Sequence, residues 1–111
     1  MTVSPVGPAP NDSFVVALDG RLNMAVTPVI RQELTDLISD GKTRLVVDLA
    51  DVETVDSSVI GALIGVLKLA RQAGGDLRIV APSIQVAEVL KMTNLTRVLP
   101  TYPSVEHAFD R

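Results

Sequence analysis

The stretch that decides the fold is residues 45–65, LVVDLADVETVDSSVIGALIG. Its first five residues, LVVDL, are a short apolar run of the kind that forms a buried β-strand, and a connection leads from them to an apolar helix. Asp56 stands directly before this helix, where its carboxylate can accept hydrogen bonds from the backbone N–H groups of the first turn. Ser57 then falls at the first helical position, with its hydroxyl near solvent. Gly74-Gly75 marks the end of the helix.

The flanking sequence continues this alternation of strands and helices. Residues 14–18 (FVVAL) predict a buried strand closed by the turn pair Asp19-Gly20. Thr27-Pro28 predicts the N-cap and first residue of a helix that Gly41 ends. After the central helix we expect strands at residues 77–81 and 96–99, a helix capped by Ser83 and a short helix capped by Ser104. Strands separated by such helices predict an α/β fold: a mostly parallel mixed sheet of four to five strands, with helices packed against it.

The composition fits one small domain and argues against several classes of function. The 111 residues are 47% hydrophobic and 21% charged, which is enough to build one core. The net charge of −3, with both signs interspersed, argues against nucleic acid and anionic membranes as partners. No apolar stretch approaches the ~20 residues that cross a bilayer. The absence of cysteine excludes thiol catalysis and suits a cytoplasmic protein, and we expect that the chain is not an enzyme.

Two features suggest chemistry, and in both a structural role is the favoured interpretation. Four acidic residues near the central motif could suggest a magnesium site: Asp48, Asp51, Glu53 and Asp56. Nothing else in the sequence completes the oxygen shell of a hard cation, so solubility and helix capping explain them better. His107 is the single histidine, and no nucleophile motif accompanies it. We therefore expect no catalytic residue, no metal site and no cofactor.

The motif and its surroundings resemble the STAS domain family, and within it the bacterial anti-sigma-factor antagonists. Such proteins carry a strand ending in Asp-Leu, a short link, and Asp-Ser-Ser or Asp-Ser-Thr at the start of a helix. Here the pattern is Val47-Asp48-Leu49 followed by Asp56-Ser57-Ser58. The likeness extends over about residues 14–110, through the segments LDGRL (18–22), QAGG (72–75), LRIV (77–80) and TNL (93–95). It implies that residues 13–111 form a STAS domain. The prolines among small residues before it predict a flexible lead or an edge strand at residues 1–12.

The resemblance implies a protein-binding switch. In such antagonists the first serine after the aspartate is phosphorylated, which here is Ser57. The kinase is also the anti-sigma factor: the unphosphorylated antagonist sequesters it and frees a sigma factor, and a phosphatase restores the active form. ATP and magnesium belong to the kinase, so the antagonist needs no cofactor. The contact surface expected around the start of the central helix comprises Asn23, Met24, Asp56, Ser57, Ser58 and Val59.

Two departures from the family pattern keep other roles open. Val59 stands where relatives usually have glycine, and Asn23 stands where they often have aspartate. The alternative within the family is a scaffold or partner subunit of a stress-signalling assembly or of an ABC-type lipid transport complex. A phospho-aspartyl receiver, another small α/β class, is disfavoured because Ala81-Pro82 replaces the lysine that receivers carry before this proline.

Overall fold

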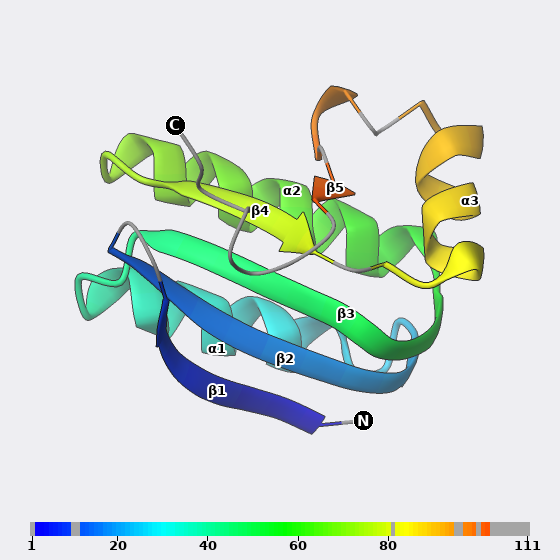
Figure 1. The fold of residues 1–111 in the computed structure, drawn as a ribbon, viewed down its shortest axis with the longest axis horizontal. Helices are drawn as coiled ribbons and strands as arrows, with labels where there is room; N and C mark the ends of the chain where they lie inside the picture. Colours follow the sequence, from blue (N-terminus) through cyan, green and yellow to red (C-terminus); the bar gives the residue numbers. More distant parts are fainter. Residues whose placement is uncertain (1, 10–11, 81, 95–96, 100, 103–111) are drawn as a thin grey trace.

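The structure is a computed structural model that describes residues 2–9, 12–80, 82–94, 97–99 and 101–102. The elements in these residues are β1 (Thr2–Ala9), β2 (Ser13–Leu22), α1 (Thr27–Ser39), β3 (Arg44–Val55), α2 (Ser57–Gln72), β4 (Asp76–Val80), α3 (Ile84–Met92) and β5 (Thr101–Tyr102). The strands form one sheet in chain order (Figure 1). β1 runs antiparallel to β2 and every other neighbouring pair is parallel, so the expected α/β fold with a mixed sheet is confirmed.

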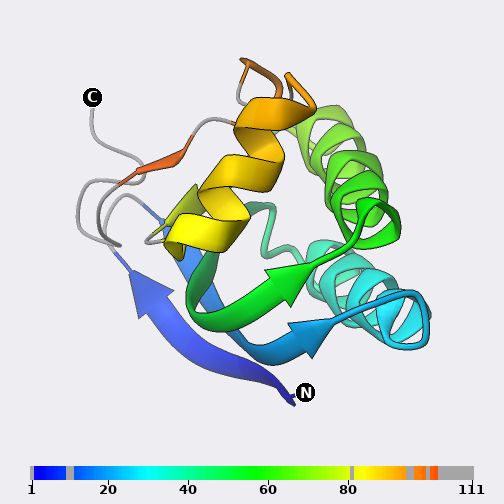
Figure 2. The ribbon, with the colours of Figure 1, turned by 90° about the vertical axis from the view of Figure 1, so that its right-hand side faces the viewer.

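Helices α1 and α2 lie side by side on one face of the sheet, and α3 lies at the end where β3 and β4 finish (Figures 1 and 2). Alternate residues of the strands point toward these helices, as the two-residue period of a strand requires. Val16 and Val47, which are register partners, belong to this core, whereas their neighbours Val15 and Val46 are buried on the opposite face. No helix within the described ranges is long and apolar enough to cross a membrane.

Strands β2 and β3 are both longer than the sequence predicts. The pair Asp19-Gly20 does not close β2, which continues to Leu22, and residues 50–55 are strand as well as connection. Gly20 lies within β2 and has a positive φ of 82°, which glycine adopts without strain. The register between β2 and β3 shifts on either side of the pair Asp19-Gly20, as at a β-bulge. The turn prediction was wrong because the glycine accommodates a bulge and the chain does not reverse. As a consequence, β2 and β3 reach the start of α2 together.

The helix starts follow the sequence at two positions and depart from it at a third. The predicted caps Asp56 and Ser83 are confirmed, since each side chain accepts a hydrogen bond from the backbone of the following helix. Thr27, in contrast, is the first residue of α1, and Val26 occupies the N-cap position without a side-chain cap. The hydroxyl of Thr27 instead bonds the carbonyl oxygen of Asn23. Gly41, with φ of 90°, follows the end of α1 as predicted.

Two further predictions concern the segments near the two ends of the chain. Residues 2–9 form an edge strand, which was one of the two alternatives for the N-terminal segment. The strand predicted at residues 96–99 is wrong for the described residues 97–99, which are a helical turn and a bend. Leu99 is instead buried in the core, and β5 provides the pairing with β4. The helix predicted after Ser104, and His107, lie outside the described residues.

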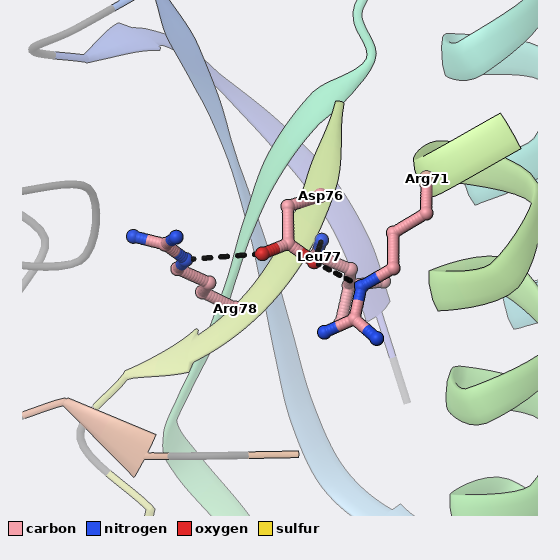
Figure 3. A network of polar contacts seen from close by, with 4 residues as sticks. All are labelled: Arg71, Asp76, Leu77 and Arg78. Carbon is pink, nitrogen blue, oxygen red and sulfur yellow. Dashed lines mark hydrogen bonds and ion pairs between the residues drawn. The ribbon is translucent and has the colours of Figure 1, made fainter. Parts of the chain in front are cut away.

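A polar network supports the start of β4, near the C-terminal end of α2. Asp76 lies between two arginines: Arg71 Nε is 3.1 Å from Asp76 Oδ1, and Arg78 Nε is 3.3 Å from Asp76 Oδ2 (Figure 3). Arg71 is 57% exposed, so its ion pair contributes about 0–1 kcal/mol. This network lies a full helix length away from Ser57.

Candidate functional site

The N-terminus of α2 is organised by the side chain of Asp56. Its backbone is extended (φ −102°, ψ 174°), and Oδ1 accepts hydrogen bonds from the backbone N–H groups of Ser58 at 3.0 Å and Val59 at 3.2 Å. These are two of the N–H groups that a helix leaves without intrahelical partners, and the positive end of the helix favours the carboxylate. Asp56 therefore fixes the geometry of the first turn of α2.

The two serines that follow Asp56 are in different environments. Ser57 is the first residue of α2, and its side chain is exposed. Ser58 is half-buried, and its hydroxyl donates to Oδ1 of Asp56 while also contacting Thr27. A macromolecule that approaches the start of α2 thus meets the hydroxyl of Ser57 first, because the hydroxyl of Ser58 is engaged inside the protein.

The charge of Asp56 is stabilised by its surroundings. The hydrogen bond from the Ser58 side chain is the largest influence and lowers the pKa of Asp56. Partial desolvation acts in the opposite direction, and the backbone N–H groups of Val59, Met24 and Ser58 add to the lowering. The net effect is a pKa below the ordinary value of an aspartate, so Asp56 is ionised at neutral pH.

A loop between β2 and α1 lies beside this helix start. Leu22 and Val55 are register partners at the ends of β2 and β3, and the carbonyl of Leu22 accepts a hydrogen bond from the Asp56 N–H at 3.1 Å. The loop that follows, residues 23–26, is closed by Asn23, whose Oδ1 accepts from the Ala25 N–H at 2.9 Å. Met24 sits at its tip and is 72% exposed. The loop that neighbours Ser57 therefore carries an apolar side chain that is exposed to solvent.

Of the six residues expected at the contact surface, the structure exposes three. The side chains of Asn23, Met24 and Ser57 are exposed, and those of Asp56 and Ser58 are half-buried. Val59 is 0% exposed and packs in the hydrophobic core, so the expectation that its side chain reaches the surface is wrong. The physical reason is the helical period: position 59 turns toward the sheet, whereas position 57 turns toward solvent.

Thr27, whose sequence predicts a helix N-cap, belongs to this site as well. Its hydroxyl lies 3.1 Å from the carbonyl oxygen of Asn23 and 2.9 Å from Ser58 Oγ. It therefore joins the loop at residues 23–26 to the start of α2. No signal in the sequence distinguishes this arrangement from an ordinary helix cap, because Ser58 lies 31 positions away.

The four acidic residues considered as a magnesium site do not form one cluster. Asp48 accepts from the Ala50 N–H at 2.9 Å, and Glu53 pairs with Arg21 at 3.1 Å. No three acidic or histidine side chains are grouped to hold a metal ion in the part of the chain that the structure describes. The side chains of Arg21 and Glu53 line an open hollow of about 550 Å³, together with Ala50, Asp51, Val52, Thr54, Ser83 and Gln85.

Comparison with known proteins identifies the class to which this fold and site belong. A family model described as the STAS domain matches residues 5–108, and the chain belongs to this family. A relative from Thermotoga neapolitana, provisionally named an anti-sigma factor antagonist, is 31% identical over 100 residues, covering 89% of this chain and 88% of the relative. The anti-sigma F factor antagonist of Paenibacillus polymyxa is 26% identical over 96 residues, covering 86% of this chain and 82% of that protein. The recognition of the family from the Asp-Ser-Ser motif is thereby confirmed.

Solved structures agree on the architecture. A crystal structure of an anti-sigma factor antagonist from Mycobacterium paratuberculosis superimposes with a TM-score of 0.80. It is 22% identical and covers 96% of this chain and 91% of its own. At this identity the likeness supports the fold alone. By homology, the chain is a STAS domain of the anti-sigma factor antagonist family.

Proposed function

We propose that this protein binds and sequesters an anti-sigma factor that is also a serine kinase, and that phosphorylation of Ser57 ends the binding. The observation that carries the proposal is the placement of an exposed serine hydroxyl at the start of α2, beside a loop that holds Met24 in solvent. An exposed apolar side chain next to a modifiable hydroxyl suits a protein contact that a charge can disrupt. The unmodified protein would free a sigma factor for transcription, and its place of action would be the cytoplasm.

The chemistry is supplied by the partners. The kinase transfers the γ-phosphoryl group of ATP to Ser57 Oγ: a new P–O bond forms, the bond to the β-phosphate breaks, ADP leaves and the hydroxyl proton is released. A phosphatase reverses the modification when water cleaves the phosphoester to give inorganic phosphate. The antagonist acts by binding, so in this proposal it is not an enzyme and needs neither metal nor cofactor.

The test starts with capture of the partner. Wild-type protein and the Ser57→Asp variant are immobilised and exposed to lysate of the source organism, and retained proteins are identified by mass spectrometry. We expect an anti-sigma factor with an ATP-binding kinase domain on the wild-type resin and much less on the variant resin. Capture of stress-assembly or transporter subunits instead would favour the alternative role within the family.

The second step locates the phosphate. The captured kinase, purified and incubated with ATP and this protein, should add one phosphate at Ser57, and the Ser57→Ala variant should remain unmodified. Phosphate found on Ser58 alone, or equal amounts on both serines, would overturn the assignment.

A further inference from the structure

The hydroxyl of Thr27 lies where the loop at residues 23–26 meets the start of α2. Its oxygen is within hydrogen-bond distance of the carbonyl oxygen of Asn23, at 3.1 Å, and of Ser58 Oγ, at 2.9 Å. Thr27 is half-buried, whereas Asn23 and Met24 are exposed. The contact thus forms the inner support of a loop whose outer side faces solvent.

The direction of these hydrogen bonds follows from counting protons. The carboxylate of Asp56 can only accept, so the single hydroxyl proton of Ser58 is directed to it. The oxygen of Ser58 then offers only lone pairs to Thr27. The carbonyl oxygen of Asn23 is likewise an acceptor, so the single hydroxyl proton of Thr27 bonds the loop or α2 at any one time, or is shared between them in a three-centre bond.

The carboxylate of Asp56 also lies close to the backbone of this loop. The backbone N–H of Met24 is among the groups that stabilise the charged Asp56 carboxylate. The same carboxylate accepts from Ser58, which contacts Thr27. The hydrogen bonds of Thr27 therefore link the loop that carries Met24 to the start of α2, and the Asp56 carboxylate, which Ser58 also contacts, lies nearby.

We propose that Thr27 is a positioning residue, whose hydroxyl holds the loop at residues 23–26 so that Met24 stands beside Ser57. The inference rests on the proposed function for its biological meaning, because it assigns to Thr27 the preorganisation of the surface that the anti-sigma factor contacts. A loop ordered before binding loses less conformational entropy when the complex forms. Loss of the Thr27 hydroxyl should therefore weaken binding although Thr27 is not itself at the exposed surface.

The first test needs no partner. Amide hydrogen exchange at Met24, Ala25 and Val26 is measured by NMR in wild type, Thr27→Val and Thr27→Ser. The valine variant keeps the shape and lacks the hydroxyl, and we expect roughly two- to tenfold faster exchange at these amides, as for the loss of one hydrogen bond. The serine variant keeps the hydroxyl and should exchange as the wild type does. Unchanged exchange in the valine variant would overturn the proposal.

Two further variants make this result specific. Thr35→Val makes the same change about two turns further along α1, and it should leave exchange in the loop unchanged. Thr27→Ala also removes the hydroxyl, without the β-branch, and replaces the valine variant if that protein does not fold. Thr27→Val or Thr27→Ala could accelerate exchange throughout the protein and not in the loop alone. That result would show a general structural role for Thr27 and contradict positioning.

The second test is a binding titration with the anti-sigma factor identified by capture. Thr27→Val should weaken the affinity roughly two- to tenfold, and Thr27→Ser should restore it. Equal affinities for wild type and Thr27→Val would refute the link between loop order and binding. If the wild type binds no anti-sigma factor, the proposed function fails, and the exchange measurement still decides whether Thr27 positions the loop.

Discussion

Ser58 donates two hydrogen bonds to Asp56, one from its backbone N–H at 3.0 Å and one from its hydroxyl. Ser57, one position earlier, is exposed at the start of the same helix. Two adjacent serines therefore have different roles: one closes the first turn of α2, and the other is accessible. This difference predicts opposite consequences of their substitution.

Ser58→Ala should lower stability, whereas Ser57→Ala should not. The alanine at position 58 removes a half-buried hydroxyl that bonds both Asp56 and Thr27, which corresponds to a loss of about 1–2 kcal/mol. Ser57→Ala removes an exposed hydroxyl and should change the free energy of unfolding by less than about 0.5 kcal/mol. Urea denaturation followed by circular dichroism measures both. Equal losses in the two variants would contradict the different environments of the two hydroxyls.

The contribution of Asp56 should depend on pH in a defined direction. Its pKa in the folded protein is lowered, chiefly by the hydroxyl of Ser58, so the folded state prefers the ionised form more than the unfolded state does. This stabilisation is fully present above the ordinary aspartate pKa of about 4 and is lost as the pH falls through the lower pKa of the folded protein.

The measurement is the difference in melting temperature between wild type and Asp56→Asn. The difference should be constant from pH 7 to pH 5 and should shrink as the pH is lowered below about 4. Asp51→Asn, at an exposed position of β3, is the control for loss of one negative charge. A difference that grows on acidification would mean that the pKa of Asp56 is raised in the folded protein.

Met24 should be a central contact of the proposed interface. Truncation of such a side chain commonly costs about 2 kcal/mol of binding free energy, and an exposed side chain contributes little to folding. Met24→Ala should therefore weaken binding of the anti-sigma factor about 30-fold with little change in melting temperature. Met92→Ala is the matched control, because Met92 is 85% exposed but lies at the end of α3. Equal affinities of the two variants would place the interface elsewhere.

Val59 should matter for folding and not for direct contact. Its side chain is 0% exposed in the core beneath α2. Val59→Ala removes two buried methyl groups and leaves a small cavity, so we expect a loss of about 2 kcal/mol in the free energy of unfolding. At temperatures where the variant is fully folded, its affinity for the partner should equal that of the wild type. A selective loss of affinity without loss of stability would return Val59 to the contact surface.

The sequence predicts local features of this protein better than long-range ones. The cap at Asp56 and the exposed position of Ser57 depend on a few neighbouring residues, and the structure agrees with both. The burial of Val59 could also have been recognised, since it belongs to the apolar face of α2 with Leu63 and Val66. The glycine that relatives carry at this position instead indicated a surface contact, which the helical period of α2 contradicts.

Features that depend on distant pairing could not be read from the sequence. Asp19-Gly20 has the composition of a turn, and only the register partners Asp51 and Val52 on β3 make it part of a strand. The hydrogen bond of Thr27 requires Ser58, which the fold brings close through β2, β3 and the loop at residues 23–26. Propensity and capping rules describe single segments, so contacts of this kind appear only once the sheet is assembled.

Phosphorylation of Ser57 should abolish binding while it leaves the fold nearly intact. A phosphoserine adds about −1.5 to −2 charges, which the N-terminus of a helix favours by about 0.3–1 kcal/mol at an exposed site. The neighbouring carboxylate of Asp56 repels the phosphate, and water weakens this repulsion, so the two effects oppose each other within the domain. We therefore expect a shift of melting temperature of only a few degrees.

At the interface the same phosphate has no such compensation. It would lose its water, and a charge buried without a matching cation is unfavourable by several kcal/mol. Binding titrations should show at least a hundredfold loss of affinity for the phosphorylated protein, and a smaller loss for Ser57→Asp, which carries less charge and a different shape. Ser57→Asn is the matched uncharged control and should bind more tightly than Ser57→Asp. A large fall in melting temperature on phosphorylation would instead mean that the modification acts by unfolding the start of α2, and unchanged affinity would mean that Ser57 lies outside the interface.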